Sequence, residues 1–263
     1  MDLGIKDKVA LVAAASRGLG KATALELSKE GALVAIAARG EAALRAAAQE
    51  IHEATGGRVL PVRADVSVAK DIERLVKAVE KEFGHIDILV NNAGGPKPGQ
   101  FTDMSDKDWL DAINLNLMSA IRLIRLVLPG MRERHWGRIV NIVSVSVKQP
   151  IPNLILSNVA RAGVVAMAKT LSDQVAADGI TVNNVCPGYT LTDRVWNLAK
   201  STAEAEGKPV EEVLAQWEAT IPARRLGKPE ELAALITFLA SEKAAYITGT
   251  TIPIDGGLVR SLL

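Results

Sequence analysis

Short apolar runs alternate with longer amphipathic segments along most of the chain. Seven runs of four or five residues are almost continuously apolar, and we expect a β-strand in each: 9–12, 33–37, 59–62, 86–90, 139–143, 181–185 and 250–254. Between them, 21–29 and 41–54 are rich in helix-forming residues, and 68–83 repeats its apolar positions every three or four residues. Strands that are apolar on both faces and separated by helices indicate a parallel sheet with helices on both sides. The pattern predicts an α/β fold, a doubly wound parallel sheet of about seven strands.

Three segments depart from this alternation. Residues 193–222 contain two helical stretches with no strand between them, which fits a small helical lid over the strand ends. The remainder shows no repeat and no linker, so we expect a single domain over residues 1–263. Two further segments, 115–128 and 159–171, are helices that are apolar nearly all round. Such helices are either buried within the chain or shared with another subunit, and the sequence leaves both alternatives open.

Composition narrows the possible classes of function. The 263 residues carry a net charge of +1 and no basic block, which argues against binding nucleic acid through its phosphates. No apolar run reaches the roughly 18 residues of a membrane span, and the first residues lack the apolar core of a secretory signal. We therefore expect a cytoplasmic protein. The one cysteine, Cys186, excludes an internal disulfide framework, and no metal-binding cluster is apparent.

The first predicted strand is followed by a turn that suits a dinucleotide. Residues 13–20 read Ala-Ala-Ala-Ser-Arg-Gly-Leu-Gly and lead into a helix, whose free N–H groups and dipole favour a pyrophosphate. The second strand ends without the acid that binds the ribose of NAD, and Arg39 stands there instead. Because a guanidinium suits a 2′-phosphate, Arg39 and Arg17 favour NADP(H) over NAD(H). Two alternatives stay open: Arg39 as a solvated surface charge, and the nearby Glu41 as the ribose acid.

Further motifs follow other predicted strands. Asp65-Val66, Asn-Asn-Ala-Gly at 91–94, Pro187-Gly188 with Thr192, Thr248-Gly249 and Ile-Asp-Gly-Gly at 254–257 resemble motifs of the short-chain dehydrogenase/reductase superfamily. The resemblance covers essentially the whole chain and is strongest to the β-ketoacyl carrier-protein reductase-like branch. It implies a Rossmann-type fold, a homotetramer, adenine contacts at 65–66 and a nicotinamide contact at Thr192. The cofactor residues that it implies are Ala14, Ser16, Arg17, Gly18, Leu19, Gly20, Arg39, Asp65, Val66, Asn92, Ala93, Gly94, Arg161, Pro187, Gly188 and Thr192.

The resemblance breaks down at the residues that carry the chemistry. In this family Asn, Ser, Tyr and Lys act on the carbonyl, and the last two form a Tyr-x-x-x-Lys motif on one helix face. Asn116 and Ser144 match the first two, but Ser157 and Arg161 stand where Tyr and Lys are expected. Serine is a poor acid at neutral pH, whereas Arg161 can still bind ribose hydroxyls and keep a positive charge near the reacting oxygen. Losing the usual acid costs about 10²–10⁴-fold in rate unless another group replaces it.

Four other residues bear on the cofactor turn and on the chemistry. Ala13 and Ala14 replace the family's Thr-Gly, and alanine lacks the freedom of glycine at positive φ. Tyr189 and Lys148 are the other candidates for a proton donor. We expect Tyr189 to pack on the pocket wall and Lys148 to be solvated.

Three functions remain open on this evidence, and the fold does not choose among them. The first is an NADP(H)-dependent oxidoreductase that acts on a small-molecule carbonyl or alcohol with the atypical set Asn116, Ser144, Ser157 and Arg161. The second is a cofactor-binding pseudoenzyme that serves as a sensor or an assembly subunit. The third is a non-redox enzyme on the same scaffold.

Overall fold

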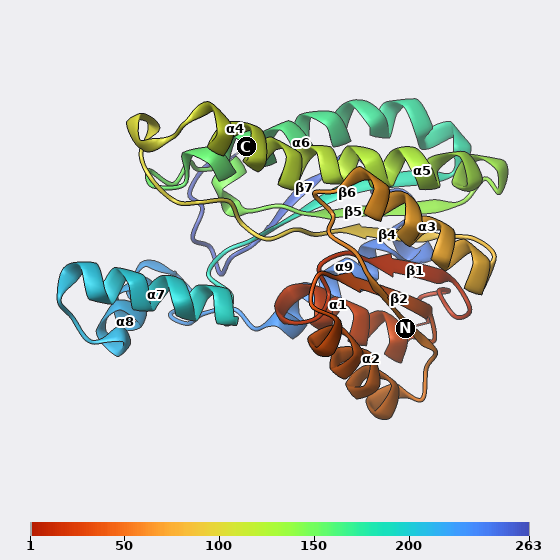
Figure 1. Cartoon of the computed structure of the whole chain (residues 1–263), viewed down its shortest axis with the longest axis horizontal. Coiled ribbons are helices and arrows are strands. Elements are labelled where there is room, and N and C mark those ends of the chain that lie inside the picture. The colour runs from red at the N-terminus through yellow and green to blue at the C-terminus, as the bar shows by residue number, and fades with distance from the viewer. Residues whose placement is uncertain (1, 263) are drawn as a thin grey trace.

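Within residues 2–262, which the computed structural model describes, seven parallel strands form one sheet at the centre of the molecule (Figure 1). The strand order is β3-β2-β1-β4-β5-β6-β7, and the direction of winding reverses between β1 and β4. This order is that of a Rossmann-type doubly wound fold, so the predicted fold class is confirmed. Each predicted strand is present, with its ends displaced by at most two residues: β1 (Val9–Val12), β2 (Leu33–Ala38), β3 (Val59–Arg63), β4 (Ile88–Asn91), β5 (Gly137–Ile142), β6 (Ile180–Pro187) and β7 (Thr251–Ile254).

Helices cover both faces of the sheet, as its apolar strands require. One face carries α1, α2 and α9, and the other carries α3, α5 and α6 (Figure 1). Neighbouring residues of β1 point to opposite faces, so that Val12 belongs to one buried core and Leu11 to the other. The helices are α1 (Gly18–Lys29), α2 (Glu41–Thr55), α3 (Ala69–Phe83), α5 (Ser119–Glu133), α6 (Ile155–Val175) and α9 (Pro229–Leu239), with short 3-10 turns at Phe101–Asp103, Val145–Val147, Ala176–Asp178 and Glu242–Ala244.

One long helical stretch, residues 106–133, precedes β5. It consists of α4 (Asp106–Ala112), a turn of π-helix (Ile113–Met118) and α5, and it is longer than the helix predicted at 115–128. By length and composition alone these 28 residues are apolar enough to cross a membrane, with a mean hydropathy of 1.3 over an 18-residue window. The stretch packs against α3, α6, β4 and β5, however, as a helix that covers a sheet does.

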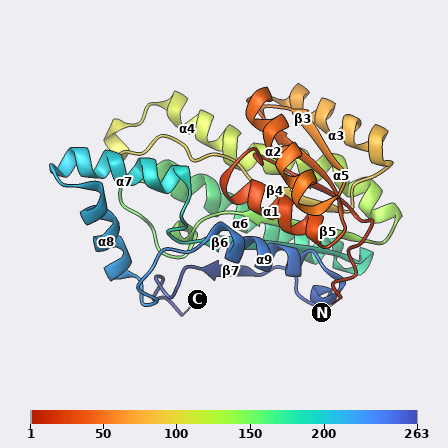
Figure 2. The ribbon, with the colours of Figure 1, turned by 90° about the horizontal axis from the view of Figure 1, so that it is seen from below.

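Two helices project beyond the sheet from the end that carries the loop after β6 (Figures 1 and 2). They lie within the segment predicted to be helical, 193–222, and share a small apolar core of their own. Tyr189, in the loop after β6, stacks on Trp217 with ring centroids 4.7 Å apart, which ties the second helix to the strand end. The two helices are α7 (Asp193–Glu206) and α8 (Val210–Thr220).

A row of buried asparagines crosses the sheet near the carboxyl ends of its central strands. Asn91 on β4, Asn141 on β5 and Asn184 on β6 are neighbours in the strand register. The Asn91 amide donates to Asn141 Oδ1 at 2.8 Å, and the Asn141 amide donates to Asn184 Oδ1 at 2.9 Å. Asn184 donates to Thr251 Oγ1 on β7 at 3.1 Å. Polar side chains are thus paired across four adjacent strands inside an otherwise apolar sheet.

Candidate active site

The loops at the carboxyl ends of β1 and β4 meet where the direction of winding reverses. Ala13 N donates to Val90 O at 3.1 Å, and Asn92 Nδ2 donates to Ala14 O at 3.3 Å. Gly20 belongs to the same contact, because a Cβ there would lie 2.6 Å from Ala14 O and 2.9 Å from Asn92 Nδ2. Two motifs that are distant in the sequence therefore meet at the switch point of the sheet, where a topology of this kind has its ligand crevice.

The turn after β1 contains one strained backbone position. Ala14 has a φ of +49°, in the left-handed region that glycine adopts freely and alanine adopts at a cost of about 1–2 kcal/mol. Gly18 also lies in the left-handed region, with a φ of +57°, which glycine adopts without strain. Ser16 and Leu19 lie in the same turn and are half-buried. No side chain caps the first turn of α1, so its N–H groups are available to an anion.

Arginines gather beyond the ends of β2 and β3. Arg39 is exposed, and its guanidinium has no hydrogen-bond or ion-pair partner in the described part of the chain, 2–262. Arg63 lies alongside, because its Nε donates to Arg39 O at 3.1 Å. Glu41, the alternative ribose acid, is paired with Arg45 at 2.7 Å. An unpaired guanidinium beside an occupied carboxylate favours a 2′-phosphate over a ribose hydroxyl.

Asp65 and Val66, which follow β3, lie in a tight turn. Asp65 Oδ1 accepts hydrogen bonds from the N–H and the hydroxyl of Ser67, at 2.9 and 2.7 Å, and Val66 is buried. On the other side, Arg17 forms an ion pair with Asp193 at 3.8 Å, which joins the turn after β1 to the start of α7. All the predicted cofactor residues except Arg161 lie at the carboxyl ends of β1, β2, β3, β4 and β6 or in the loops that follow them. Arg161 lies on α6.

The motif after β6 approaches the turn after β1 at the start of α7. Thr192 is the N-cap of α7, and its methyl carbon lies 3.6 Å from the place where a Cβ of Gly18 would stand. A Cβ on Gly188 would lie 2.8 Å from Asp255 Cβ, so only glycine lets the C-terminal motif approach Pro187 and Gly188. The predicted nicotinamide residues are therefore held against the predicted pyrophosphate turn.

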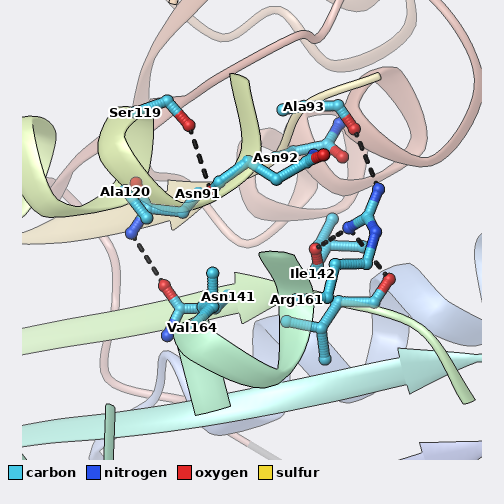
Figure 3. A pocket seen from close by; sticks show the side chains of 11 residues that line it. Asn91, Asn92, Ala93, Ser119, Ala120, Asn141, Ile142, Arg161 and Val164 are labelled. Carbon is cyan, nitrogen blue, oxygen red and sulfur yellow. Dashed lines mark hydrogen bonds between the residues drawn. The ribbon is translucent and has the colours of Figure 1, made fainter. Parts of the chain in front are cut away.

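Asn116 occupies an unusual position in the helical stretch. It lies in the π-helical turn between α4 and α5, and its Nδ2 donates to Gly94 O at 3.0 Å. Its Oδ1 is buried and has no hydrogen-bond partner within residues 2–262. With Asn92 and Arg161 it lines a cavity of about 20 Å³, which is enough for one water molecule. Figure 3 shows Asn92 and Arg161 at this cavity.

The two candidate serines share one property. Ser146 N donates to Ser144 Oγ at 3.1 Å, and Arg161 Nε donates to Ser157 Oγ at 3.2 Å. Neither serine hydroxyl donates to another group among the residues that the structure describes, 2–262. Ser157 and Arg161 lie one turn apart on α6, as the preserved motif spacing predicts. Both serines therefore accept a hydrogen bond and keep a proton to donate.

The Arg161 guanidinium turns toward the ends of β4 and β5 (Figure 3). Nη1 donates to Ile142 O at 3.1 Å and to Val143 O at 3.2 Å, and Nη2 approaches Ala93 O at 3.5 Å. Desolvation lowers the pKa of Arg161 to about 10, and the positive charge of Arg194 acts in the same direction. The group stays charged at neutral pH and clamps α6 to two strand ends.

The two alternative proton donors have different surroundings. Tyr189 is half-buried and stacks on Trp217, and burial raises the pKa of its phenol, which makes it a weaker acid. Lys148 is half-buried rather than solvated, and in the described chain, 2–262, its ammonium makes no hydrogen bond or ion pair. It lies near Cys186, a buried thiol whose pKa desolvation raises to about 12. Among residues 2–262, no group of three His, Cys, Asp or Glu side chains is arranged to hold a metal ion.

Two features of this region are absent from the sequence prediction. Asn91 belongs to the Asn-Asn-Ala-Gly motif, but the apolar pattern of the strands does not indicate that its side chain pairs with an asparagine on the next strand. Arg194, in the first turn of α7, lies over Gly95, where an added Cβ would overlap its guanidinium. The one sequence signal for Arg194 is that it lies two residues after Thr192, a predicted cofactor residue.

The chain is similar along its whole length to curated reductases. A family model described as enoyl-(acyl carrier protein) reductase matches residues 13–259. The 3-oxoacyl-[acyl-carrier-protein] reductase FabG of Haemophilus influenzae is 38% identical over 257 residues, which cover 98% of this chain and 100% of that protein. A putative ketoacyl reductase of Streptomyces coelicolor is 37% identical over 256 residues, covering 95% of this chain and 97% of the relative.

Solved structures show the same likeness. L-sorbose reductase from Gluconobacter frateurii, complexed with NADPH and L-sorbose, has a TM-score of 0.96 and 36% identity, with 100% of both chains covered. A variant of actinorhodin polyketide ketoreductase with NADPH has a TM-score of 0.93 and 36% identity, covering 97% of this chain and 98% of that chain. On its fold, its motifs and these matches, the chain belongs to the short-chain dehydrogenase/reductase superfamily, among the ketoacyl-reductase-like oxidoreductases.

Proposed function

We propose that the protein is an NADP(H)-dependent oxidoreductase that interconverts a carbonyl and an alcohol on a small molecule. The names of its relatives support this, since they are ketoacyl reductases, and both solved structures described above contain NADPH. The residues present also suit such a cofactor. The first turn of α1 has free N–H groups, a Cβ on Gly94 would meet nothing within 4 Å, and Arg39 carries an unpaired guanidinium for a 2′-phosphate.

Bound NADPH supplies the hydride. The chain must then hold the carbonyl oxygen and supply a proton as negative charge develops on it. We assign the two free hydroxyl protons, on Ser144 and Ser157, to that oxygen. Arg161 supports this role because its Nε donates to Ser157 Oγ, which polarises the hydroxyl and keeps a positive charge close to the alkoxide.

In this proposal, water is the final source of the proton. Neither serine hydroxyl is an acid at neutral pH, and a pKa of about 10 leaves Arg161 protonated at pH 7. The free Oδ1 of Asn116 and the guanidinium of Arg161 border the cavity of about 20 Å³, where one water molecule fits. We infer that a water held there resupplies the proton. We expect turnover slower by about 10²–10⁴-fold than with a well-matched acid.

The observation that carries the proposal is the 3.2 Å hydrogen bond from Arg161 to Ser157, since it keeps a hydroxyl backed by a cation at the family's catalytic position. The test measures NADPH oxidation with a panel of ketones, aldehydes and β-keto esters. We expect slow turnover by the wild type and a loss of about 10²-fold in Ser144→Ala. Tight NADPH binding without turnover in the wild type, together with turnover in Ser157→Tyr/Arg161→Lys, would refute the proposal.

One observation favours a second function. The Arg161 guanidinium uses most of its donors on main-chain carbonyls and on Ser157, which leaves little for a ribose. A protein that binds NADP(H) as a sensor or an assembly subunit needs no proton donor. Tight NADPH binding with no turnover of any carbonyl supports that function, whereas the non-redox alternative predicts a converted substrate with unchanged NADPH absorbance.

We further propose that α7 and α8 form a lid over the substrate site, and that the protein is a cytoplasmic homotetramer. The lid is supported by Thr192, which begins α7 beside the turn after β1. Assembly is supported by apolar side chains left exposed on α4, α5 and α6, namely Leu110, Leu126 and Val159. Light scattering after size-exclusion chromatography tests the assembly, and a monomer at micromolar concentration would contradict it.

A further inference from the structure

A cation without a partner lies over the candidate site. Arg194 extends from the first turn of α7 to the loop after β4, where its guanidinium covers Gly95 so closely that an added Cβ would overlap it. The residue as a whole is exposed, yet desolvation lowers the pKa of its guanidinium. Across residues 2–262 this side chain makes no hydrogen bond and no ion pair. Its fixed fork of N–H donors is therefore partly withdrawn from water and still unused.

Other positive charges surround Arg194. Its charge lowers the pKa of Arg161, so the two guanidiniums are close enough to repel each other. Lys148, also without an ion-pair partner in the described chain, 2–262, lies near Cys186, whose thiol takes a hydrogen bond from the main chain of Ser144. Positive charges from α6, from α7 and from the turn after β5 thus lie near Arg161 and Cys186.

The acidic side chains of the adjoining loops are engaged elsewhere. Asp193, next to Arg194 in the chain, forms its ion pair with Arg17 at the rim. Asp255 accepts hydrogen bonds from the main-chain N–H groups of Gly257 and Val259, at 2.9 and 2.8 Å. These carboxylates leave the positive charge of Arg194 uncompensated, and a desolvated charge is stabilised by a charged hydrogen-bonding partner.

We propose that the carbonyl substrate carries a carboxylate group and that Arg194 recognises it. This inference rests on the carbonyl-reducing function proposed above. The planar guanidinium fork matches the two oxygens of a carboxylate, and a partly desolvated position strengthens the contact. Arg194 lies against Gly95 and near Arg161, whereas its chain neighbours Thr192 and Asp193 contact the turn after β1, so the experiment must distinguish a substrate carboxylate from a cofactor phosphate.

The experiment compares keto acids with their neutral esters. The probes are pyruvate, acetoacetate and levulinate, each beside its methyl ester, because the three acids place the carboxylate at increasing distance from the ketone. Calorimetry measures their binding to the full-length protein loaded with NADP⁺, and NADPH oxidation measures kcat/KM. Arg194→Met removes the charge, and Gly95→Ala keeps the charge but displaces the guanidinium. Lys200→Met is the matched control, since Lys200 is an exposed cation on α7 that faces Trp196.

We expect the wild type to bind at least one keto acid more tightly than its ester. Arg194→Met should lower this acid-to-ester ratio by about 10–100-fold, the range of one charge-assisted hydrogen-bond pair. Gly95→Ala should lower the ratio in the same direction, and Lys200→Met should leave it unchanged. The Kd for NADPH should stay the same in all three variants.

Three results would overturn the inference: no keto acid preferred by the wild type, an equal loss for acid and ester in Arg194→Met, or weaker NADPH binding in that variant. The last result would assign Arg194 to a cofactor phosphate. Preferential binding of a keto acid without any NADPH oxidation would refute the proposed reductase function, while the recognition of a carboxylate by Arg194 would stand.

Discussion

The change Arg161→Lys tests how the candidate site is held together. Lysine keeps the positive charge but offers one nitrogen where arginine offers three. The arginine makes hydrogen bonds to three main-chain carbonyls and to Ser157, at 3.1 to 3.5 Å. One ammonium cannot reach the ends of two strands and the Ser157 hydroxyl together, so we expect two of the four contacts to be lost. Hydrogen bonds to charged groups contribute about 1.5–3 kcal/mol each and the 3.5 Å contact is weak, so the free energy of unfolding should fall by about 2–4 kcal/mol.

Urea unfolding at a fixed protein concentration measures this loss, because assembly makes apparent stability depend on concentration. The midpoint should fall while the slope with denaturant stays unchanged. Arg125→Lys is the matched control: its exposed side chain on α5 makes no hydrogen bond or ion pair within residues 2–262, so its effect should stay within about 0.5 kcal/mol. If Arg161→Lys and Arg125→Lys both unfold at the urea midpoint of the wild type, the hydrogen bonds of Arg161 do not stabilise the fold.

Further predictions concern the turn after β1, the end of β2 and the buried thiol on β6. Ala14→Gly should relieve the left-handed strain and raise the free energy of unfolding by about 0.5–1 kcal/mol; an unchanged or lower urea midpoint would contradict this. Arg39→Ala should weaken NADPH binding about 10–100-fold in a fluorescence titration and spare NADH. Arg58, an exposed arginine paired with Glu82, is the control, and Arg58→Ala should affect neither cofactor; equal losses for both cofactors in Arg39→Ala would exclude a 2′-phosphate contact. Burial raises the pKa of the Cys186 thiol from 9.0 to about 12, so it should resist Ellman's reagent at pH 8 until the chain unfolds, and rapid labelling of the native protein would contradict it. Because the unfolded thiol loses its proton first, the contribution of Cys186 to stability is complete below about pH 9 and falls as the pH rises toward 12.

Hydrophobic patterning was sufficient to predict the sheet, because strands covered on both faces are apolar throughout. The strand ends were predicted less well. The fourth strand was expected at 86–90 and is found at Ile88–Asn91. The strand includes Asn91, which is in register with Asn141 on the next strand and pairs with its side chain, although asparagine is rare in strands. That contact depends on a partner 50 residues away, which a local pattern does not contain.

The motifs located the candidate site because each crevice loop directly follows its strand in the sequence. The directions of the long side chains were not predictable in the same way. Arg161 donates to the main-chain carbonyls of Ile142 and Val143. Because every residue carries a main-chain carbonyl, the sequence does not indicate which carbonyls an arginine will bind. The π-helical turn that holds Asn116 likewise lies in an apolar segment that has the appearance of a regular helix. Arg194 reaches the site only because the first turn of α7 brings its guanidinium against Gly95 in the loop after β4, a contact between segments about 100 residues apart.

The asparagine row on β4, β5 and β6 has a consequence for folding. Strands made of valine, isoleucine and leucine could slide by two residues against their neighbours and still bury apolar side chains. A slide of β5 would separate Asn141 from both Asn91 and Asn184, and each buried amide left unpaired costs about 1–3 kcal/mol. The row therefore selects against misaligned sheets while the chain folds. By fixing the register of β4, β5 and β6, it also fixes where the loops after these strands leave the sheet relative to one another.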